Sequence, residues 1–306
     1  MEEIEQRVIS KVQRFPNDEA AARLAQLVDP TERIRDLADD LQVMLGSSQV
    51  RRWAKKHYKR RTLGVLGLLD HIVPLYIFAG DVGTGKSETA AVIGQAFAER
   101  HGCEIAQVYM STRARGSGYV GQMGSLLTAA FDQVHALRER EGMPVILVID
   151  EADSLLTSRA TVEQHHEDKS GVNTILQQLD ALRSGPREIV VIAITNRPDV
   201  LDPAVLRRAA RVVEFERPGS EQRRALFSKY LTKVVSAAQI KRLVAASEPR
   251  PPSEGAEALA LSFADLTLRA LVPELRAAIG EDRALDGKML ERRLVELKPT
   301  PEMSRS

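Results

Sequence analysis

The sequence predicts an α/β fold with a five-stranded parallel sheet, followed by a small C-terminal α-helical domain. Short apolar runs alternate with longer amphipathic segments between Leu75 and Phe215. Near-continuous apolar strands separated by helices are typical of a parallel sheet that is buried on both faces. After Pro218 the strand pattern stops and only helical spacing of apolar residues remains. A glycine-rich loop follows the first apolar run, which places a candidate ligand site at one edge of the sheet.

Residues 1–70 are predicted to form a short helical segment and a basic linker. Apolar residues such as Val8 and Val12 recur at helical spacing. A basic run, Arg51–Arg61, follows. The most apolar stretch, Leu63–Ala79, is interrupted by charged and proline residues, so it does not predict a membrane span.

The large domain is predicted at residues 71–218 and the helical domain at 219–297. The five expected strands are Leu75–Ala79, Glu104–Met110, Val145–Ile149, Ile189–Ile194 and Arg211–Phe215. The expected helices are Lys86–His101, Gly121–Arg140, Ser170–Arg183, Glu221–Leu231, Ala237–Ala246, Phe263–Ile279 and Gly287–Leu297. The tail at 298–306 is short and polar, and we expect it to fray.

The composition is that of an ordinary globular protein. Of 306 residues, 43% are hydrophobic and 28% are charged, and the formal net charge is +1. The single cysteine, Cys103, cannot form an internal disulfide, which fits a reducing cytoplasm. The acidic start of the chain lacks the regions of a signal peptide. A cytoplasmic protein is therefore expected.

The segment Gly80–Ser87 reads GDVGTGKS and matches the phosphate-binding pattern G-x-x-x-x-G-K-[ST] in full. Its glycines allow backbone conformations in which several N–H groups converge on one phosphate. Lys86 is then expected to reach the terminal phosphates of ATP, and Ser87 to supply a hydroxyl to Mg²⁺. The predicted nucleotide-binding residues of this loop are Gly80, Asp81, Val82, Gly83, Thr84, Gly85, Lys86 and Ser87.

In the run VILVIDEAD, Asp150 and Glu151 come directly after an apolar strand. Because the carboxyl ends of parallel strands share one edge of a sheet, Asp150 is expected to lie near the phosphates and to hold Mg²⁺ with Ser87. Glu151 is expected to act as the base for the attacking water. Asn196, at the end of IVVIAITN, is a candidate for binding that water, although asparagine at a strand end is usually a turn residue.

The segments GDVGTGKS, VILVIDEAD and AITNRPDVLDPAVLRRAAR, in this order and spacing, resemble the AAA+ ATPases. The resemblance implies a helical lid and a homo-oligomeric ring, usually a hexamer, with ATP at the subunit interfaces. Asn196 would be the first sensor residue. An arginine would reach the γ-phosphate of the neighbouring subunit, and the chain reads RRAAR where the family usually has R-x-G-R. Arg208 is favoured for this role and Arg211 is second; a solvated basic helix end is the alternative.

A loop that reads RGSGYVG resembles the pore loop of family members that thread peptides. Tyr119 and Val120 would grip a substrate peptide there, because ring and aliphatic contacts do not depend on its sequence. The alternative is that Tyr119 is a core residue after a strand.

The segments SGVNTILQQLDAL and RRAARVVEFERPGS resemble the pachytene-checkpoint type of these ATPases, which partly unfold HORMA-domain proteins. The short chain resembles the bacterial members of cyclic-oligonucleotide anti-phage systems. This resemblance implies a HORMA-domain partner with a bound nucleotidyltransferase, whose complex the ATPase dissociates. Leu266 occupies the place of the usual second sensor arginine, so Arg269 is proposed as its substitute at the nucleotide.

A DNA-directed AAA+ ATPase, such as a helicase loader or a transposition ATPase, is the alternative function. The basic run Arg51–Arg61 contains Trp53 and Tyr58, so it could follow phosphates and stack on bases. A solvated helix face is favoured over this interpretation because the overall charge is near neutral. Nucleic acid is therefore not the expected partner.

Overall fold

The computed structural model describes residues 8–28, 31–60, 63–110, 122–157, 166–185, 188–251 and 257–302. The chain divides into two compact units, which are described separately. Unit 1 comprises Met1–Leu27, Thr31–Ala79 and Ser87–Glu214. Unit 2 comprises Val28–Pro30, Gly80–Lys86 and Phe215–Ser306. The domain limits at 71–218 and 219–297 stay predictions.

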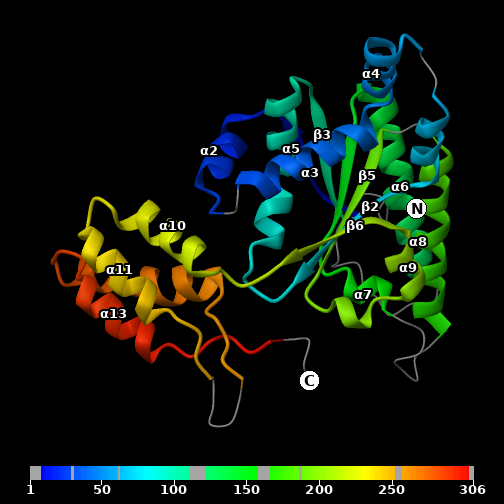
Figure 1. Ribbon diagram of the computed structural model, residues 1–306. Helices are drawn as coiled ribbons and strands as arrows, with labels where there is room; N and C mark the ends of the chain where they lie inside the picture. Colours follow the sequence, from blue (N-terminus) through cyan, green and yellow to red (C-terminus); the bar gives the residue numbers. More distant parts are fainter. Residues whose placement is uncertain are drawn as a thin grey trace. The chain divides into compact units, whose positions relative to one another are not determined.

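A six-stranded sheet lies at the centre of unit 1 (Figure 1). Its order is β1-β3-β4-β5-β2-β6, and β2, β3, β4 and β5 pair in parallel. The α/β fold is confirmed, and each of the five predicted strands is present. The strands are β1 (Ile9–Phe15), β2 (Val73–Gly80), β3 (Ile105–Met110), β4 (Val145–Ile149), β5 (Ile189–Thr195) and β6 (Ala209–Phe215).

The predicted helix is wrong over Ile9–Phe15, which forms the edge strand β1. It pairs antiparallel with β3, with Val12 opposite Val108 and Phe15 opposite Ile105. The Phe15 side chain is buried, and its ring lies so close to Gly94 that a Cβ there would clash at 2.5 Å. Apolar residues four apart fit a helix and a strand alike over so short a run, and the pairing partner is distant in sequence.

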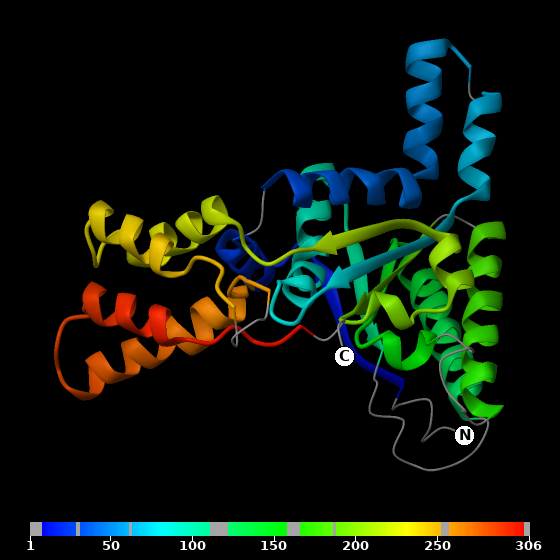
Figure 2. The same ribbon diagram turned by 60° about the horizontal axis from the view of Figure 1, so that its bottom comes forward.

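Helices cover both faces of the sheet in unit 1. Figures 1 and 2 show α6 and α8 together on one face and α3 and α5 on the other. Alternate strand residues, such as Leu75, Ile77 and Leu147, join a single core cluster with Phe131 of α6 and Ile175 of α8. Because these strands are covered on both sides, nearly all of their residues are buried. The bounds are α2 (Asp18–Gln26), α3 (Thr31–Leu45), α5 (Lys86–His101), α6 (Gln122–Glu141), α7 (Asp153–Leu156), α8 (His166–Ser184), η3 (Pro198–Val200) and α9 (Pro203–Arg208).

The basic run forms most of α4 (Ser47–Tyr58), which is followed by the 3₁₀ segment η1 (Gly64–His71). Figure 2 shows α4 and η1 side by side. Trp53 is 44% exposed and Tyr58 55% exposed, and their rings meet edge to face with centroids 5.3 Å apart. In the part of the chain that the structure describes, no helix combines the length and the apolar character needed to cross a membrane.

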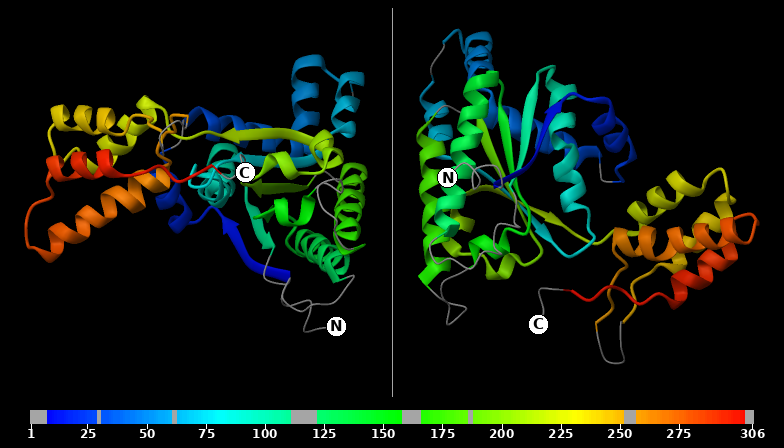
Figure 3. Two further views of the ribbon diagram at one scale, coloured as in Figure 1. Left: turned by 90° about the horizontal axis from the view of Figure 1, so that it is seen from below. Right: turned by 180° about the vertical axis from the view of Figure 1, so that it is seen from behind.

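Unit 2 contains a small helical core. Figure 3 shows α13 between α11 and the rod made by η4 and α12. Leu226, Leu243, Leu266 and Leu290 are buried in its apolar cluster. The predicted helix at 263–279 is present, but its first half, η4, is a π-helix rather than an α-helix. The bounds are α10 (Ser220–Leu231), α11 (Ala237–Ala246), η4 (Asp265–Leu271), α12 (Val272–Gly280) and α13 (Gly287–Glu296).

The expectation that the chain frays from Lys298 onward is wrong for Lys298–Thr300. Pro299 is buried. The Thr300 hydroxyl donates a hydrogen bond of 2.6 Å to Oδ1 of Asp265, and the Lys298 carbonyl accepts one of 3.1 Å from Arg269. These partners lie about 30 residues earlier in the sequence, so no local pattern marked this segment as ordered.

Candidate functional site

The phosphate-binding loop of unit 2 adopts backbone conformations that require glycine. Gly80, Gly83 and Gly85 have φ angles of 149°, 75° and 99°. A Cβ at Gly83 would also lie 2.7 Å from the Cβ of Ala264, so a side chain would not fit there. Such a loop can turn several backbone N–H groups toward one anion, as the sequence predicts.

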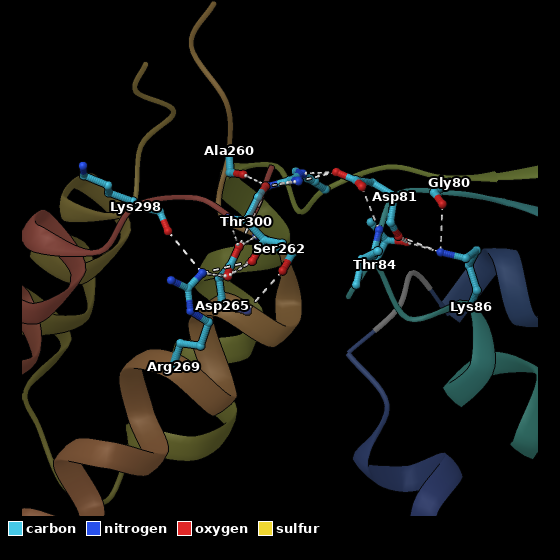
Figure 4. A network of polar contacts seen from close by, with 12 residues as sticks. Gly80, Asp81, Thr84, Lys86, Ala260, Ser262, Asp265, Arg269, Lys298 and Thr300 are labelled. Atoms are coloured by element: carbon cyan, nitrogen blue, oxygen red, sulfur yellow. Dashed lines mark hydrogen bonds and ion pairs between the residues drawn. The ribbon is translucent and has the colours of Figure 1, made fainter. Parts of the chain in front are cut away.

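The ammonium group of Lys86 is hydrogen-bonded to the backbone of this loop. Its Nζ donates to the carbonyls of Gly80 and Asp81 at 2.9 and 2.6 Å and lies 3.4 Å from Oγ1 of Thr84 (Figure 4). The lysine is 5% exposed, and Thr84 in turn donates to the Asp81 carbonyl at 2.8 Å. The positive charge is therefore placed beside the backbone that is expected to bind phosphate, where it suits a polyanionic ligand.

In unit 1, Ser87 and Asp150 are brought together although they lie on different elements. The Ser87 hydroxyl at the start of α5 donates a hydrogen bond of 3.1 Å to Oδ2 of Asp150, which follows β4. Oδ1 of Asp150 accepts a hydrogen bond from the Glu151 backbone N–H at 2.8 Å. A hydroxyl and a carboxylate oxygen are ligands that Mg²⁺ prefers. The two residues predicted to share the metal thus lie in contact.

Glu151 combines an exposed side chain with an unusual backbone. Its φ angle is 52°, in the left-handed region that residues other than glycine seldom adopt. The next residue, Ala152, donates a backbone hydrogen bond of 2.8 Å to Ile194 on β5. Strained backbone of this kind costs on the order of 1–3 kcal/mol and clusters at active sites. The geometry suits a base beside Asp150, and this role stays a prediction.

Asn196 follows β5 at the same edge of the sheet. Thr195 donates from Oγ1 to Oδ1 of Asp153 at 3.1 Å and accepts a hydrogen bond of 2.9 Å from the Arg197 N–H. The contacts of Thr195 with Asp153 and of Ala152 with Ile194 join the segment after β4 to the end of β5. Asn196 therefore follows the strand next to the one that ends before Asp150 and Glu151. Its role as a sensor of the attacking water stays a prediction.

Arg208 and Arg211 each have a carboxylate partner within the chain. Arg208, at the end of α9, forms a two-pronged ion pair with Asp180 of α8 at 3.2 and 3.3 Å. Arg211, on β6, bonds to Asp40 of α3 at 2.5 Å. The proposal that one of them acts on a neighbouring subunit is not tested by these contacts.

The structure describes the contacts of Arg269 but not those of the predicted pore-loop residues. In unit 2, Arg269 donates to Asp265 at 2.5 Å and to Thr300 Oγ1 at 3.0 Å. Its side chain is 46% exposed, and its role at the nucleotide stays a prediction. Tyr119 and Val120 lie outside the described residues.

Sequence reasoning missed Arg217, which contacts the phosphate-binding loop in unit 2. Its Nε donates a hydrogen bond of 2.8 Å to Oδ2 of Asp81. Arg217 lies within the segment RRAARVVEFERPGS, but that resemblance assigns it no role, and a single arginine before Pro218 matches no binding motif.

A strand, a glycine-rich loop with a buried lysine, and a serine paired with a strand-end aspartate together define a P-loop ATPase. The family described as "ATPase family associated with various cellular activities (AAA)" matches residues 76–217. This range includes Lys86, Asp150 and Asn196.

Similar proteins extend this assignment over nearly the whole chain. CD-NTase-associated protein 6 of Escherichia coli strain KTE188 is 37% identical over 298 residues, which are 97% of each chain. The protein of that description from strain MS 115-1 is 35% identical and covers 94% of this chain and 93% of its own. The chain therefore belongs to the AAA family of ATPases, in the group that includes these relatives.

Two solved structures support the same family assignment. The first, "Structure of E. coli MS115-1 HORMA:CdnC:Trip13 complex", contains a chain with a TM-score of 0.87 and 32% identity, and the match covers 97% of this chain and 98% of that one. The second, "Structure of Rhizobiales Trip13", has a TM-score of 0.73 and 29% identity, and the match covers 96% and 100% of the two chains.

Proposed function

We propose that this ATPase is a ring-shaped remodeller that dissociates a complex containing a HORMA-domain protein, and thereby restrains anti-phage signalling by a nucleotidyltransferase. The observation that carries the proposal is similarity along the whole chain to CD-NTase-associated protein 6, together with the fold shared with a chain of the HORMA:CdnC:Trip13 complex. The similarity includes the regions outside residues 76–217, which a general AAA match does not cover. The proposed place of action is the cytoplasm, and the proposed assembly is a homohexamer.

The chain's own residues support ATP with Mg²⁺ as the cofactors. The glycine backbone at Gly83 and Gly85 and the Lys86 ammonium suit the phosphates. Ser87 and Asp150 offer oxygen ligands 3.1 Å apart for the metal. Glu151, with its exposed carboxylate, is proposed to accept the proton of the attacking water. Bound Mg²⁺ would neutralise charge on the phosphates during their transfer.

Coupling of hydrolysis to a partner is proposed to depend on Tyr119 and Val120 in a central pore. An aromatic and an aliphatic residue can grip the side chains of a peptide without reading its sequence. Tyr119→Ala should keep basal ATPase activity within about twofold of the unsubstituted chain and lose remodelling, because ring contacts account for much of the grip at such sites. If remodelling is unchanged, Tyr119 is a core residue instead.

The test of the proposal is capture of the partner by a trapped ring. Glu151→Gln should bind ATP but hydrolyse it at least about 100-fold more slowly, because the base is lost. With ATP, this variant should form a hexamer and retain a purified HORMA-domain protein during gel filtration. The matched control is Glu151→Gln with Lys86→Ala, which should neither assemble nor retain the partner. A trapped variant that stays monomeric with ATP contradicts the ring, and a hexamer that releases the HORMA protein contradicts the proposed partner.

A further inference from the structure

A carboxylate is built into the phosphate-binding loop. Asp81 follows the first glycine, and its side chain is only 14% exposed. Its Oδ1 accepts a hydrogen bond of 2.8 Å from the Val82 N–H, which holds the group against the loop backbone. A negative charge fixed in a loop that binds a polyphosphate repels its ligand, and low exposure weakens screening by solvent. The loop therefore needs a compensating positive charge besides Lys86, whose ammonium serves the phosphates.

Arg217 supplies this charge from the segment between β6 and α10, two residues after the strand ends. Its Nε and Nη2 both donate to Oδ2 of Asp81, the former at 2.8 Å. The arginine side chain is 7% exposed, so the pair is largely shielded from water. Arginine suits this position because its planar guanidinium keeps its charge and holds several acceptors in fixed directions.

The other guanidinium contacts of Arg217 fasten it to two further segments. Nη1 donates to the Ala260 carbonyl at 2.7 Å, and Nη2 donates to the Thr300 carbonyl at 2.6 Å. Figure 4 shows Asp81, Ala260 and Thr300 in one polar network with Asp265. All three guanidinium nitrogens therefore have partners, and those partners come from the phosphate-binding loop, the segment before η4 and the C-terminal segment.

Asp265, at the start of η4, binds the C-terminal segment through hydrogen bonds. This carboxylate is fully buried and accepts hydrogen bonds from the Thr300 hydroxyl at 2.6 Å and from the Ser262 N–H at 3.0 Å. Burial acts to raise the pKa of Asp265, but these bonds and the one from Arg269 outweigh it, and the pKa is lowered. Asp265 is therefore ionised at neutral pH and holds Thr300, whose carbonyl accepts a hydrogen bond from Arg217.

We propose that Arg217 is a positioning residue of the ATPase site, which neutralises Asp81 and is itself held by the segment Lys298–Thr300. Nucleotide affinity then depends on Arg217 mainly through the charge of Asp81, because the other nearby carboxylate, Asp265 at 3.9 Å, is also paired with Arg269. The segment Lys298–Thr300 then also influences nucleotide affinity, although it contains no residue of a known nucleotide-binding motif.

The test is a double-mutant cycle on nucleotide affinity. Titration of fluorescent ATP and ADP analogues gives Kd for the unsubstituted chain, Arg217→Met, Asp81→Asn and the double variant. Arg217→Met should weaken ATP binding about tenfold, because it leaves an unpaired carboxylate beside the ligand. The double variant lacks the unpaired carboxylate, so it should bind ATP at least about fivefold more tightly than Arg217→Met. A double variant as weak as Arg217→Met would overturn the proposal.

Two controls separate charge from misfolding. Arg242→Met, at an exposed arginine of α11, should leave Kd unchanged. In Arg217→Met, the loss should be larger for the ATP analogue, which carries one more negative charge than ADP, and it should shrink with added salt. An equal loss for both nucleotides at every salt concentration would point to a disordered loop and contradict charge compensation.

The role of the C-terminal segment has its own test. Thr300→Val should weaken ATP binding by about two- to threefold, because the hydrogen bond to Asp265 is lost. Unchanged affinity would remove the C-terminal segment from the proposal.

Discussion

The hydroxyl of Ser87 donates a hydrogen bond of 3.1 Å to the carboxylate of Asp150, which joins the first turn of α5 to the end of β4. The two residues are 63 positions apart in sequence. Their contact brings a neutral and a charged oxygen ligand to one point of the sheet edge, where a metal can use both. This contact underlies the first prediction.

Ser87→Ala should raise the Mg²⁺ concentration that gives half-maximal ATPase activity by about tenfold, because one ligand of the metal is lost. Activity measured against Mg²⁺ concentration tests this. ATP binding without metal should be unaffected. Ser184→Ala, at an exposed serine at the end of α8, is the control and should leave the Mg²⁺ response unchanged. An unchanged response in Ser87→Ala would remove Ser87 from the metal site.

Lys86→Ala should weaken ATP binding at least about 100-fold and abolish turnover, because the ammonium beside the loop is lost. Calorimetric titration with ATP and a phosphate-release assay measure the two effects. Lys241→Ala, at an exposed residue of α11, should behave like the unsubstituted chain. Turnover that survives in Lys86→Ala would show that the site is misassigned.

Arg208 is predicted to act on the site of a neighbouring subunit. Arg208→Ala and Glu151→Gln should each lower ATPase activity at least about 100-fold. Mixing them should restore part of the activity, because an intact Arg208 on a Glu151→Gln subunit can serve the intact base of its neighbour. The matched control mixes Arg208→Ala with the double variant, which offers no intact arginine and should not restore activity. If only Arg211→Ala is rescued by Glu151→Gln, Arg211 is the residue that acts in trans.

Asp265 should make unfolding depend on pH. Its folded pKa lies below the ordinary value of 3.8, so the carboxylate contributes stability above about pH 4 and loses it as the pH falls through the folded pKa. Asp265→Asn should lower the free energy of unfolding by about 2 kcal/mol at pH 7 and at pH 5.5, and the difference should shrink at pH 3.5. Urea titrations at the three pH values measure this. Glu296→Gln, at an exposed residue of α13, is the control. A difference that grows toward low pH would show that Asp265 is not stabilised as an anion.

DNA binding by the basic helix α4 would distinguish a DNA-directed ATPase from the proposed remodeller. The remodeller should show no binding to duplex DNA at about 50 mM salt, because few phosphates would be neutralised. Fluorescence anisotropy with a labelled duplex measures this across salt concentrations. Binding that weakens steeply with salt, and that is lost in Lys55→Ala with Lys56→Ala, would favour the DNA-directed alternative.

The sequence alone determined the fold class, the phosphate-binding loop and the position of the two carboxylates that follow β4. These features are local: a motif such as GDVGTGKS dictates its own backbone, and an apolar strand that ends in Asp150 and Glu151 places them at a known edge of a parallel sheet. The five predicted strands follow from apolar runs for the same reason.

Only the tertiary structure decided which distant residues complete these features. The edge strand β1 depends on pairing with β3, about 95 residues later, while its own short pattern fits a helix equally well. Arg217 is 136 positions from Asp81 and 83 from Thr300, yet its guanidinium binds both. An ion pair between single residues this far apart has no period or motif in the sequence, because folding alone brings its partners together.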